Sequence, residues 1–190
     1  MSRIELKEVA KAQIKGNIGI LFVMALIVFA IVFVCEWIPM IGGIATLIIT
    51  PAFSLSLCAV YLKLTKNDET IGVGDIFGKF DQTGKALWLQ ILINIFTFLW
   101  TLLLIIPGII KSYSYSMSFY ILADNPELTA RETLAKSKQI MEGHKFDLFV
   151  LQLSFFWWYL LTGITCGLAG IYVMPYISAT VANFYNSIKE

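Results

Sequence analysis

Charged residues are scarce in this chain. They make up 14% of its 190 residues, hydrophobic residues make up 58%, and the mean hydropathy is +0.76. A soluble domain carries roughly 25% charged residues, because it must cover its surface in water. The scarcity excludes an ordinary soluble domain and predicts that much of the apolar surface faces lipid. The net charge of +1 gives no sign of a nucleic acid as partner.

Histidine and cysteine are also rare. The single histidine, His144, and the three cysteines stand far apart in the sequence. Metal sites need several such ligands at short spacing, so we expect no metal and no cofactor. Cys35 and Cys166 both fall near the predicted outer surface, and a disulfide between them stays open. Isolated cysteines in membrane helices more often serve as small apolar residues.

Catalytic motifs are missing as well. The sequence contains no P-loop, no G-x-S-x-G, no HExxH and no GxGxxG. His144 follows Gly143, which indicates a helix border, and it has no obvious nucleophile as a partner. We therefore predict that this chain is not an enzyme.

Long apolar runs dominate the sequence. A helix needs about 20 apolar residues to cross a hydrocarbon core of about 30 Å. One shorter run, Ile109–Ala123, contains Lys111 and four serines. Five other runs meet or approach the required length: Asn17–Val34, Met40–Leu62, Ala86–Ile106, Leu148–Gly163 and Gly167–Ser187. The predicted fold class is therefore an all-α polytopic membrane bundle.

The distribution of lysine and arginine favours six spans. With six spans and a cytoplasmic N-terminus, 13 of the 14 cations lie on the inner side and only Lys111 lies outside. If Ile109–Ala123 did not cross, everything after it would invert, and six of the 14 would lie outside. Because cytoplasmic segments are enriched in Lys and Arg, we predict six transmembrane helices with both termini in the cytoplasm.

A weak internal similarity predicts three copies of one unit within a single membrane domain, 1–190. Gly16 and Gly84 are 68 residues apart, and so are Pro39 and Pro107. Each unit would hold an amphipathic helix on the inner surface followed by a hairpin of two spans. The three units would cover residues 1–62, 73–123 and 127–190.

The first amphipathic helix, Ser2–Lys15, carries a line of cations. Ser2 and Glu5 match a capping box, as Thr129 and Glu132 do in the third unit. We expect the first helix to lie in the interface with its apolar side toward lipid and its cations near anionic headgroups. The alternative is that the cations only set topology. They recur every four residues: Arg3, Lys7, Lys11 and Lys15.

The fourth predicted span is the most polar one. Ser112, Ser116 and Tyr120 would share one helical face, and the cost of polar groups in lipid predicts a central position. Close helix packing and a polar pathway for a ligand both stay open. Lys111 would either anchor the helix at the outer headgroups or contact an anionic substrate. Candidate residues for packing or for a pathway are Lys111, Ser112, Tyr115, Ser116 and Tyr120, with Asn94 and Gln152 bonding from neighbouring spans.

A longer pattern centres on this span. It runs through Ile106-Pro107-Gly108-Ile109-Ile110-Lys111-Ser112-Tyr113-Ser114-Tyr115, Ala123-Asp124-Asn125-Pro126 and Ala135-Lys136-Ser137-Lys138. The pattern resembles the bacterial domain-of-unknown-function 975 family, and more distantly the membrane domain fused to some glycerophosphodiester phosphodiesterases. The resemblance covers essentially the whole chain. It implies a multi-helix protein of the bacterial plasma membrane and no particular activity or catalytic residue.

Three functions are compatible with these features. The first is a noncatalytic scaffold, partner subunit or envelope-stress factor, which would bind a protein partner or form a homo-oligomer. The second is a small transporter or lipid-handling protein that uses the polar fourth span. The third is an immunity protein against a membrane-active peptide, which only size and topology suggest.

Overall fold

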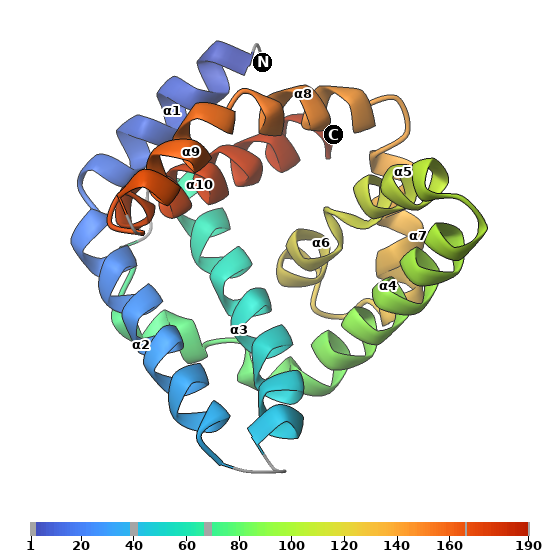
Figure 1. The fold of residues 1–190 in the computed structure, drawn as a ribbon, viewed down its shortest axis with the longest axis horizontal. Helices are drawn as coiled ribbons and strands as arrows, with labels where there is room; N and C mark the ends of the chain where they lie inside the picture. The colour runs from blue at the N-terminus through green and yellow to red at the C-terminus, as the bar shows by residue number, and fades with distance from the viewer. Residues whose placement is uncertain (1–2, 39–41, 67–69, 166, 190) are drawn as a thin grey trace.

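The computed structural model describes residues 3–38, 42–66, 70–165 and 167–189, and every regular element in these ranges is helical (Figure 1). The predicted all-α class is therefore confirmed. The α-helices are α1 (Arg3–Lys15), α2 (Ile18–Glu36), α3 (Gly42–Thr65), α4 (Thr83–Leu103), α5 (Ile105–Tyr115), α6 (Ser118–Asp124), α7 (Ala130–Ile140), α8 (Lys145–Leu153), α9 (Phe156–Ile164) and α10 (Gly170–Ile188). Two short 3-10 helices, η1 (Val73–Phe77) and η2 (Phe80–Gln82), precede α4.

Four segments within the described ranges are long and apolar enough to cross a membrane. They are α2, α3, a stretch from Val73 to Leu103 that ends in α4, and a stretch from Lys145 to Ile164 that joins α8 and α9. These match the first, second, third and fifth predicted spans. The predicted fourth span is broken into two short helices, and the predicted sixth, in α10, is long enough at 19 residues but less apolar. Four of the six predicted spans are therefore matched by this measure.

Two predicted spans are interrupted rather than continuous. The fourth breaks into α5 and α6 at Ser116, and the fifth breaks into α8 and α9 at Ser154. Each serine hydroxyl donates to a backbone carbonyl three residues earlier, Ser116 Oγ to Tyr113 O at 2.8 Å and Ser154 Oγ to Leu151 O. Serine bonds of this kind compete with the helical hydrogen bonds and bend helices. A continuous apolar run therefore gave no sign of these breaks.

The apolar face of α1 packs on protein. Leu6, Ala10 and Ile14 are buried, and α1 lies along α10. We expected this face to rest on lipid, and that prediction is wrong. An amphipathic pattern shows that one face is covered, but it does not distinguish a neighbouring helix from a bilayer.

Each amphipathic segment lies on a different group of helices. α1 contacts α10, η1 contacts α2 and α3, and α7 contacts α4, α5 and α6. At the centre, α3 packs against both α6 and α10, and these three helices contribute nearly half of the buried apolar cluster. Figure 1 shows the short helix α6 near the middle of the molecule.

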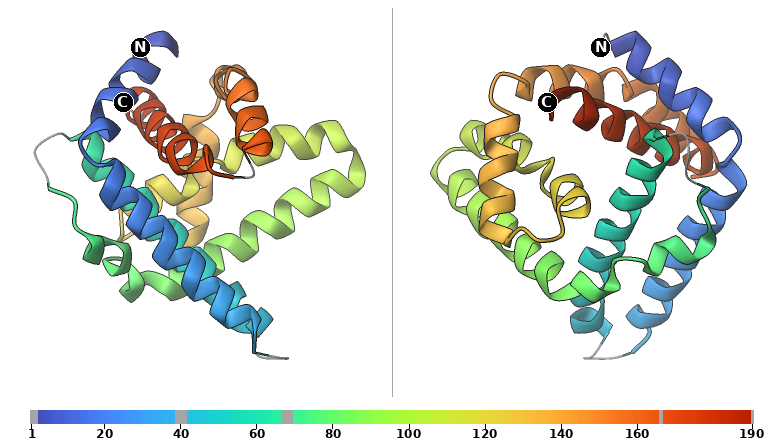
Figure 2. Two further views of the ribbon diagram at one scale, coloured as in Figure 1. Left: turned by 60° about the vertical axis from the view of Figure 1, so that its left-hand side comes forward. Right: turned by 180° about the vertical axis from the view of Figure 1, so that it is seen from behind.

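Two glycines allow close contact within two antiparallel helix pairs. A Cβ on Gly42 would overlap the carbonyl of Cys35, and one on Gly108 would overlap Thr101. α2 can therefore approach α3, and α4 can approach α5, only where a side chain is absent. Figure 2 shows these two pairs extending in different directions from the rest of the fold.

Some predicted features fall on residues outside the described ranges. Ser2 of the first capping box, Pro39 of the proposed repeat and Cys166 of the possible disulfide are among them. The other capping box is confirmed. Glu132 N donates to Thr129 Oγ1 at 3.4 Å, and Thr129 N donates to the Glu132 carboxylate at 2.8 Å.

Candidate functional site

The polar residues of the fourth predicted span do not share one face. Ser112 is exposed, Ser116 is half-buried at the helix break, and Tyr120 is buried beyond it. The break at Ser116 changes the helix direction, so the regular four-residue spacing no longer aligns these side chains. The predicted common face is therefore wrong, although the central position of Tyr120 is as expected.

Two serine hydroxyls of this span, those of Ser114 and Ser116, donate to backbone carbonyls. Ser114 Oγ donates to Ile110 O at 2.9 Å, within α5. Ser137 Oγ of α7 donates to Ser114 O at 2.9 Å, so a buried serine from α7 bonds to α5. Ser118 Oγ is buried and has no hydrogen-bond partner among the described residues. These bonds fit helix packing better than a water-filled pathway.

Tyr120 belongs to a central group of polar side chains. Its ring stacks on Tyr185 with 5.9 Å between centroids, and its hydroxyl lies 3.5 Å from Ser178 O. Tyr185 OH donates to Asp124 Oδ2 at 3.3 Å, and Lys189 forms an ion pair with the same oxygen at 3.1 Å. The group joins α6 to α10 at the ends of both helices.

The other candidates in and near the span contact different partners. Lys111 Nζ lies 4.6 Å from the ring centre of Trp100 in α4, a cation–π geometry. Tyr115 packs near Phe96, with 6.3 Å between ring centroids. Both side chains thus contact α4.

Gln152 and Asn94 differ in what they bond. Gln152 Oε1 accepts a hydrogen bond from Tyr113 OH at 2.9 Å, so it does link the fifth predicted span to the fourth. Asn94 Oδ1 instead accepts from Gln90 Nε2 of its own helix at 2.8 Å and is exposed. The expectation that Asn94 bonds to the serine-rich segment is wrong. It borders a hollow of about 440 Å³ that Glu36, Gly43, Thr46, Leu47, Thr50, Pro51 and Gln90 also line.

Three of the four cations on α1 are exposed: Arg3, Lys11 and Lys15. Lys7 is different, because its Nζ lies 4.3 Å from the ring centre of Phe155 and 3.4 Å from Ser154 O. Burial there lowers the pKa of Lys7. Lys7 therefore contacts the α8–α9 break, and the other three cations remain available to lipid headgroups.

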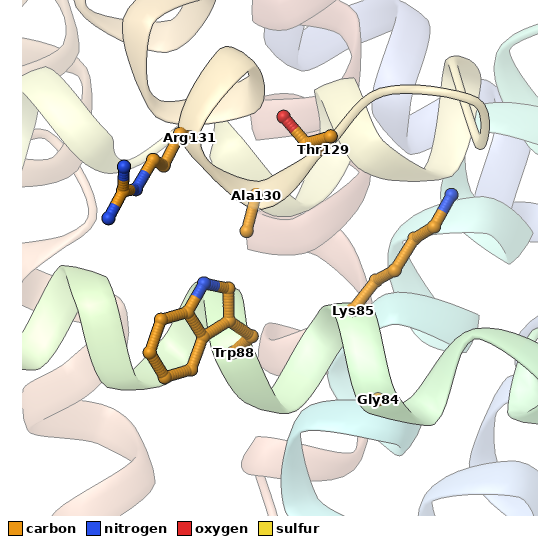
Figure 3. A pocket seen from close by; sticks show the side chains of 6 residues that line it. All are labelled: Gly84, Lys85, Trp88, Thr129, Ala130 and Arg131. Atoms are coloured by element: carbon orange, nitrogen blue, oxygen red, sulfur yellow. The ribbon is translucent and has the colours of Figure 1, made fainter.

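A second basic surface, which the sequence did not reveal, lies where the starts of α4 and α7 meet (Figure 3). We call it the α4–α7 groove; it has a volume of about 440 Å³. Its lining residues are Gly84, Lys85, Trp88, Thr129, Ala130 and Arg131. Lys85 and Arg131 are 46 positions apart in the numbering, and only the packing of α7 on α4 brings them to one groove.

Metal-binding clusters were not expected, and the described residues hold no group of three or more His, Cys, Asp or Glu side chains that could bind a metal ion. The ion pairs in the same part of the chain are Lys63–Asp75, His144–Asp147 and Lys189–Asp124. They link neighbouring helices or turns and do not converge on one point.

Comparison with known proteins gives a family and no activity. A family model described as "Protein of unknown function (DUF975)" matches residues 1–113 and 101–190, so the two matches together cover the chain. No curated protein and no solved structure matches. The distant resemblance to a phosphodiesterase membrane domain thus has no support from these comparisons. The resemblance read from the segment around Lys111 is confirmed, and the chain belongs to the DUF975 family of proteins of unknown function.

Proposed function

We propose that this chain is a noncatalytic integral protein of the bacterial plasma membrane, with six spans and both termini in the cytoplasm. The four long apolar segments support a membrane location. The placement of 13 of the 14 cations on one side supports the count of six. The two further spans would be α5–α6 and α10.

The hydrogen bond between Lys85 and Pro126 is the main observation that supports a fourth span across the membrane. Lys85 stands at the start of α4, Pro126 follows α6, and Nζ lies 2.6 Å from the proline carbonyl oxygen. If α4 crosses the bilayer, the chain must return to the starting side before Pro126. The segment α5–α6 makes that return, despite its serines and its break.

The ion pair between Asp124 and Lys189 supports the sixth span in the same way. It places the end of α10 beside the end of α6, with 3.1 Å between Nζ and Oδ2. If α8–α9 crosses away from this side, α10 has to cross back. Three hairpins of two spans follow, α2–α3, α4–α6 and α8–α10.

A threefold repeat fits the helix contacts. In each proposed unit the amphipathic segment packs on the hairpin of another unit: η1 on the first, α7 on the second and α1 on the third. This cyclic order is what three copies of one element around a common centre would produce. The inner helix of each hairpin, α3, α6 and α10, lies in or beside the central contacts.

Cysteine accessibility tests the topology. Single cysteines replace Leu104, Leu168, Lys136 or Lys189 in a variant without native cysteines, and a membrane-impermeant maleimide is added to intact cells. We expect positions 104 and 168 to react at once, and positions 136 and 189 to react only after permeabilisation. Labelling of 136 or 189 in intact cells would overturn the six-span proposal.

Among roles, we favour a scaffold or partner subunit. Ser114 donates to a carbonyl of its own helix and accepts from Ser137 of α7, and the Tyr113 hydroxyl donates to Gln152 of α8, which supports a packed bundle rather than a pathway. Purification in native lipid with quantitative mass spectrometry tests this role. A protein partner, or a second copy, at constant stoichiometry is the expected result; reproducible isolation of the chain alone contradicts it.

Lipid handling is the second candidate, and the α4–α7 groove is the observation that favours it. The groove combines two cations with an exposed tryptophan near the proposed inner surface of the membrane. Exposed Arg3, Lys11 and Lys15 on α1 support further contacts with anionic headgroups. The immunity role keeps only size and topology as support.

A further inference from the structure

We propose that the α4–α7 groove is a binding site for the phosphate headgroup of an anionic glycerophospholipid of the inner leaflet. The inference rests on the proposed topology, which places the starts of α4 and α7 at the cytoplasmic surface. It differs from the general attraction of α1 to lipid, because it names a formed hollow with a specific lining. Charge, depth and space each support it.

Two cations flank the groove from different helices. Figure 3 shows Arg131 on one side of Trp88 and Ala130, and Lys85 on the other. Lys85 uses one of its three donors on Pro126 O, which holds its ammonium group at the end of the groove away from Arg131 and leaves two donors. Arg131 is exposed and pairs with no acidic side chain in the described ranges. Both groups therefore have free N–H donors for phosphate oxygens.

The acid on α7 forms no ion pair with these cations. Glu132 directs its carboxylate to Thr129, with 2.8 Å from Oε2 to the Thr129 backbone nitrogen and 2.6 Å to Thr129 Oγ1. The carboxylate is thereby held in the capping box of α7. The N–H donors of Lys85 and Arg131 are therefore not taken up by Glu132, although its negative charge lies at the edge of the groove.

Trp88 places the groove at the depth of lipid headgroups. It lies three residues beyond Lys85 on α4, so both side chains point to the same side of the helix. Its side chain is half exposed, at 50%. Exposed tryptophans one turn into a span are typical of the membrane–water interface, where the indole borders both headgroups and acyl chains. A lipid bound here would place its phosphate beside one of the cations and its glycerol and chains along the indole.

Small residues leave room for a headgroup. Gly84 and Ala130 form part of the lining, and a Cβ added to Gly84 meets no atom within 4 Å. The Cβ position at Gly84 is therefore free of contacts. A free phosphate would use the cations alone, whereas a lipid would need the space and the indole as well.

Lipid retention by the purified full chain in neutral detergent tests the site. Phosphatidylglycerol and phosphatidylcholine with the same acyl chains are titrated, and bound lipid is counted by native mass spectrometry. We expect one phosphatidylglycerol to bind tightly. Arg131→Gln, Trp88→Ala and Gly84→Leu should each weaken that binding roughly tenfold, the loss expected for one charge-assisted contact or for a filled groove.

Matched controls separate the alternatives. Lys138→Gln removes another exposed cation of α7 that is not part of the groove, so it should leave the tight site unchanged. Equal losses in Lys138→Gln and Arg131→Gln would overturn the proposal in favour of diffuse charge attraction. Competition by glycerol phosphate or inorganic phosphate, with no effect of Gly84→Leu or Trp88→Ala, would show a free-phosphate site and also overturn it. The titration takes place in detergent, so its failure is distinct from a failed topology, which cysteine labelling reports.

Discussion

The side-chain amides of Gln13 and Asn183 face each other and exchange two hydrogen bonds. Asn183 Nδ2 donates to Gln13 Oε1 at 2.7 Å, and Gln13 Nε2 donates to Asn183 Oδ1 at 3.5 Å. Asn183 is buried and also donates to Ala179 O. Paired amides satisfy each other in a way that two hydroxyls or two carboxylates do not. The pair fixes α1 against α10.

Replacing both amides of this pair should destabilise the fold by less than the sum of the two single replacements. Gln13→Ala leaves the buried Asn183 amide without its partner, and we expect a loss of about 1–3 kcal/mol in the free energy of unfolding. The double variant Gln13→Leu/Asn183→Leu should lose less than the sum of the single variants. Thermal unfolding in detergent measures this, with exposed Gln139→Ala as the control. Additive losses would contradict the direct pair.

Gly108 should tolerate no side chain. A Cβ there would overlap Thr101, including its backbone, so Gly108→Ala has to push α5 away from α4. Overpacking of this kind costs about 1–3 kcal/mol. Gly19→Ala is the matched control, because a Cβ there meets nothing within 4 Å. Unfolding in detergent should show a loss for position 108 alone, and equal stability of the two variants would disprove the close contact.

Asp124 should stabilise the fold mainly through its hydrogen bond with Tyr185. Asp124→Ala removes the acceptor of the buried Tyr185 hydroxyl and the partner of Lys189, and we expect about 1–3 kcal/mol of destabilisation. Asp124→Asn keeps an acceptor for the hydroxyl, so its effect should be smaller. Lys189→Gln should have the smallest effect, since the ion pair is partly exposed. The rate of limited proteolysis within α10 ranks the three variants by their destabilisation. A faster cleavage in Lys189→Gln than in Asp124→Ala would contradict the expected ranking.

The start of α7 should loosen in acid. Hydrogen bonds from Thr129, first from its side chain and then from its backbone, hold the pKa of Glu132 below its ordinary value of 4.5. A carboxyl with a lowered folded pKa stabilises the fold above pH 4.5, and this contribution is lost as the pH falls through the lower folded value. Hydrogen exchange at residues 130–134, corrected for the intrinsic rate, should rise in that window.

Glu132→Gln is the control for this pH dependence. It removes the titrating group but keeps a side chain that can accept from Thr129 N. The variant should show weaker protection of α7 near neutral pH and little further change in acid. Unchanged acid sensitivity in Glu132→Gln would assign the effect to another group.

Local patterns in the sequence predicted part of this fold, and contacts between distant residues decided the rest. The apolar runs gave the long helices, and Thr129 with Glu132 gave the start of α7, because both signals lie within a few residues. The break at Ser116 was missed, since a serine bonds its own backbone in some helices and not in others. Its outcome depends on packing, such as the bond from Ser137 to Ser114 O.

The candidate site was harder to predict than the helices. In the sequence Lys85 is only one of the 13 cations assigned to the inner side, and nothing near Lys85 or Trp88 points to Arg131. Their common groove exists because α7 packs on α4. Lys7 is the converse case. Its spacing in the sequence grouped it with the exposed cations of α1, but its ammonium group lies over the ring of Phe155.

The contact between α1 and α10 sets an order on biosynthesis. α1 is made before α10, and Asn183 is added 170 residues after Gln13. Until α10 has been made, the apolar face with Leu6, Ala10 and Ile14 lacks its main covering helix, and only the smaller contact with α3 is available. A chain that ends before α10 therefore leaves part of this apolar face uncovered by protein.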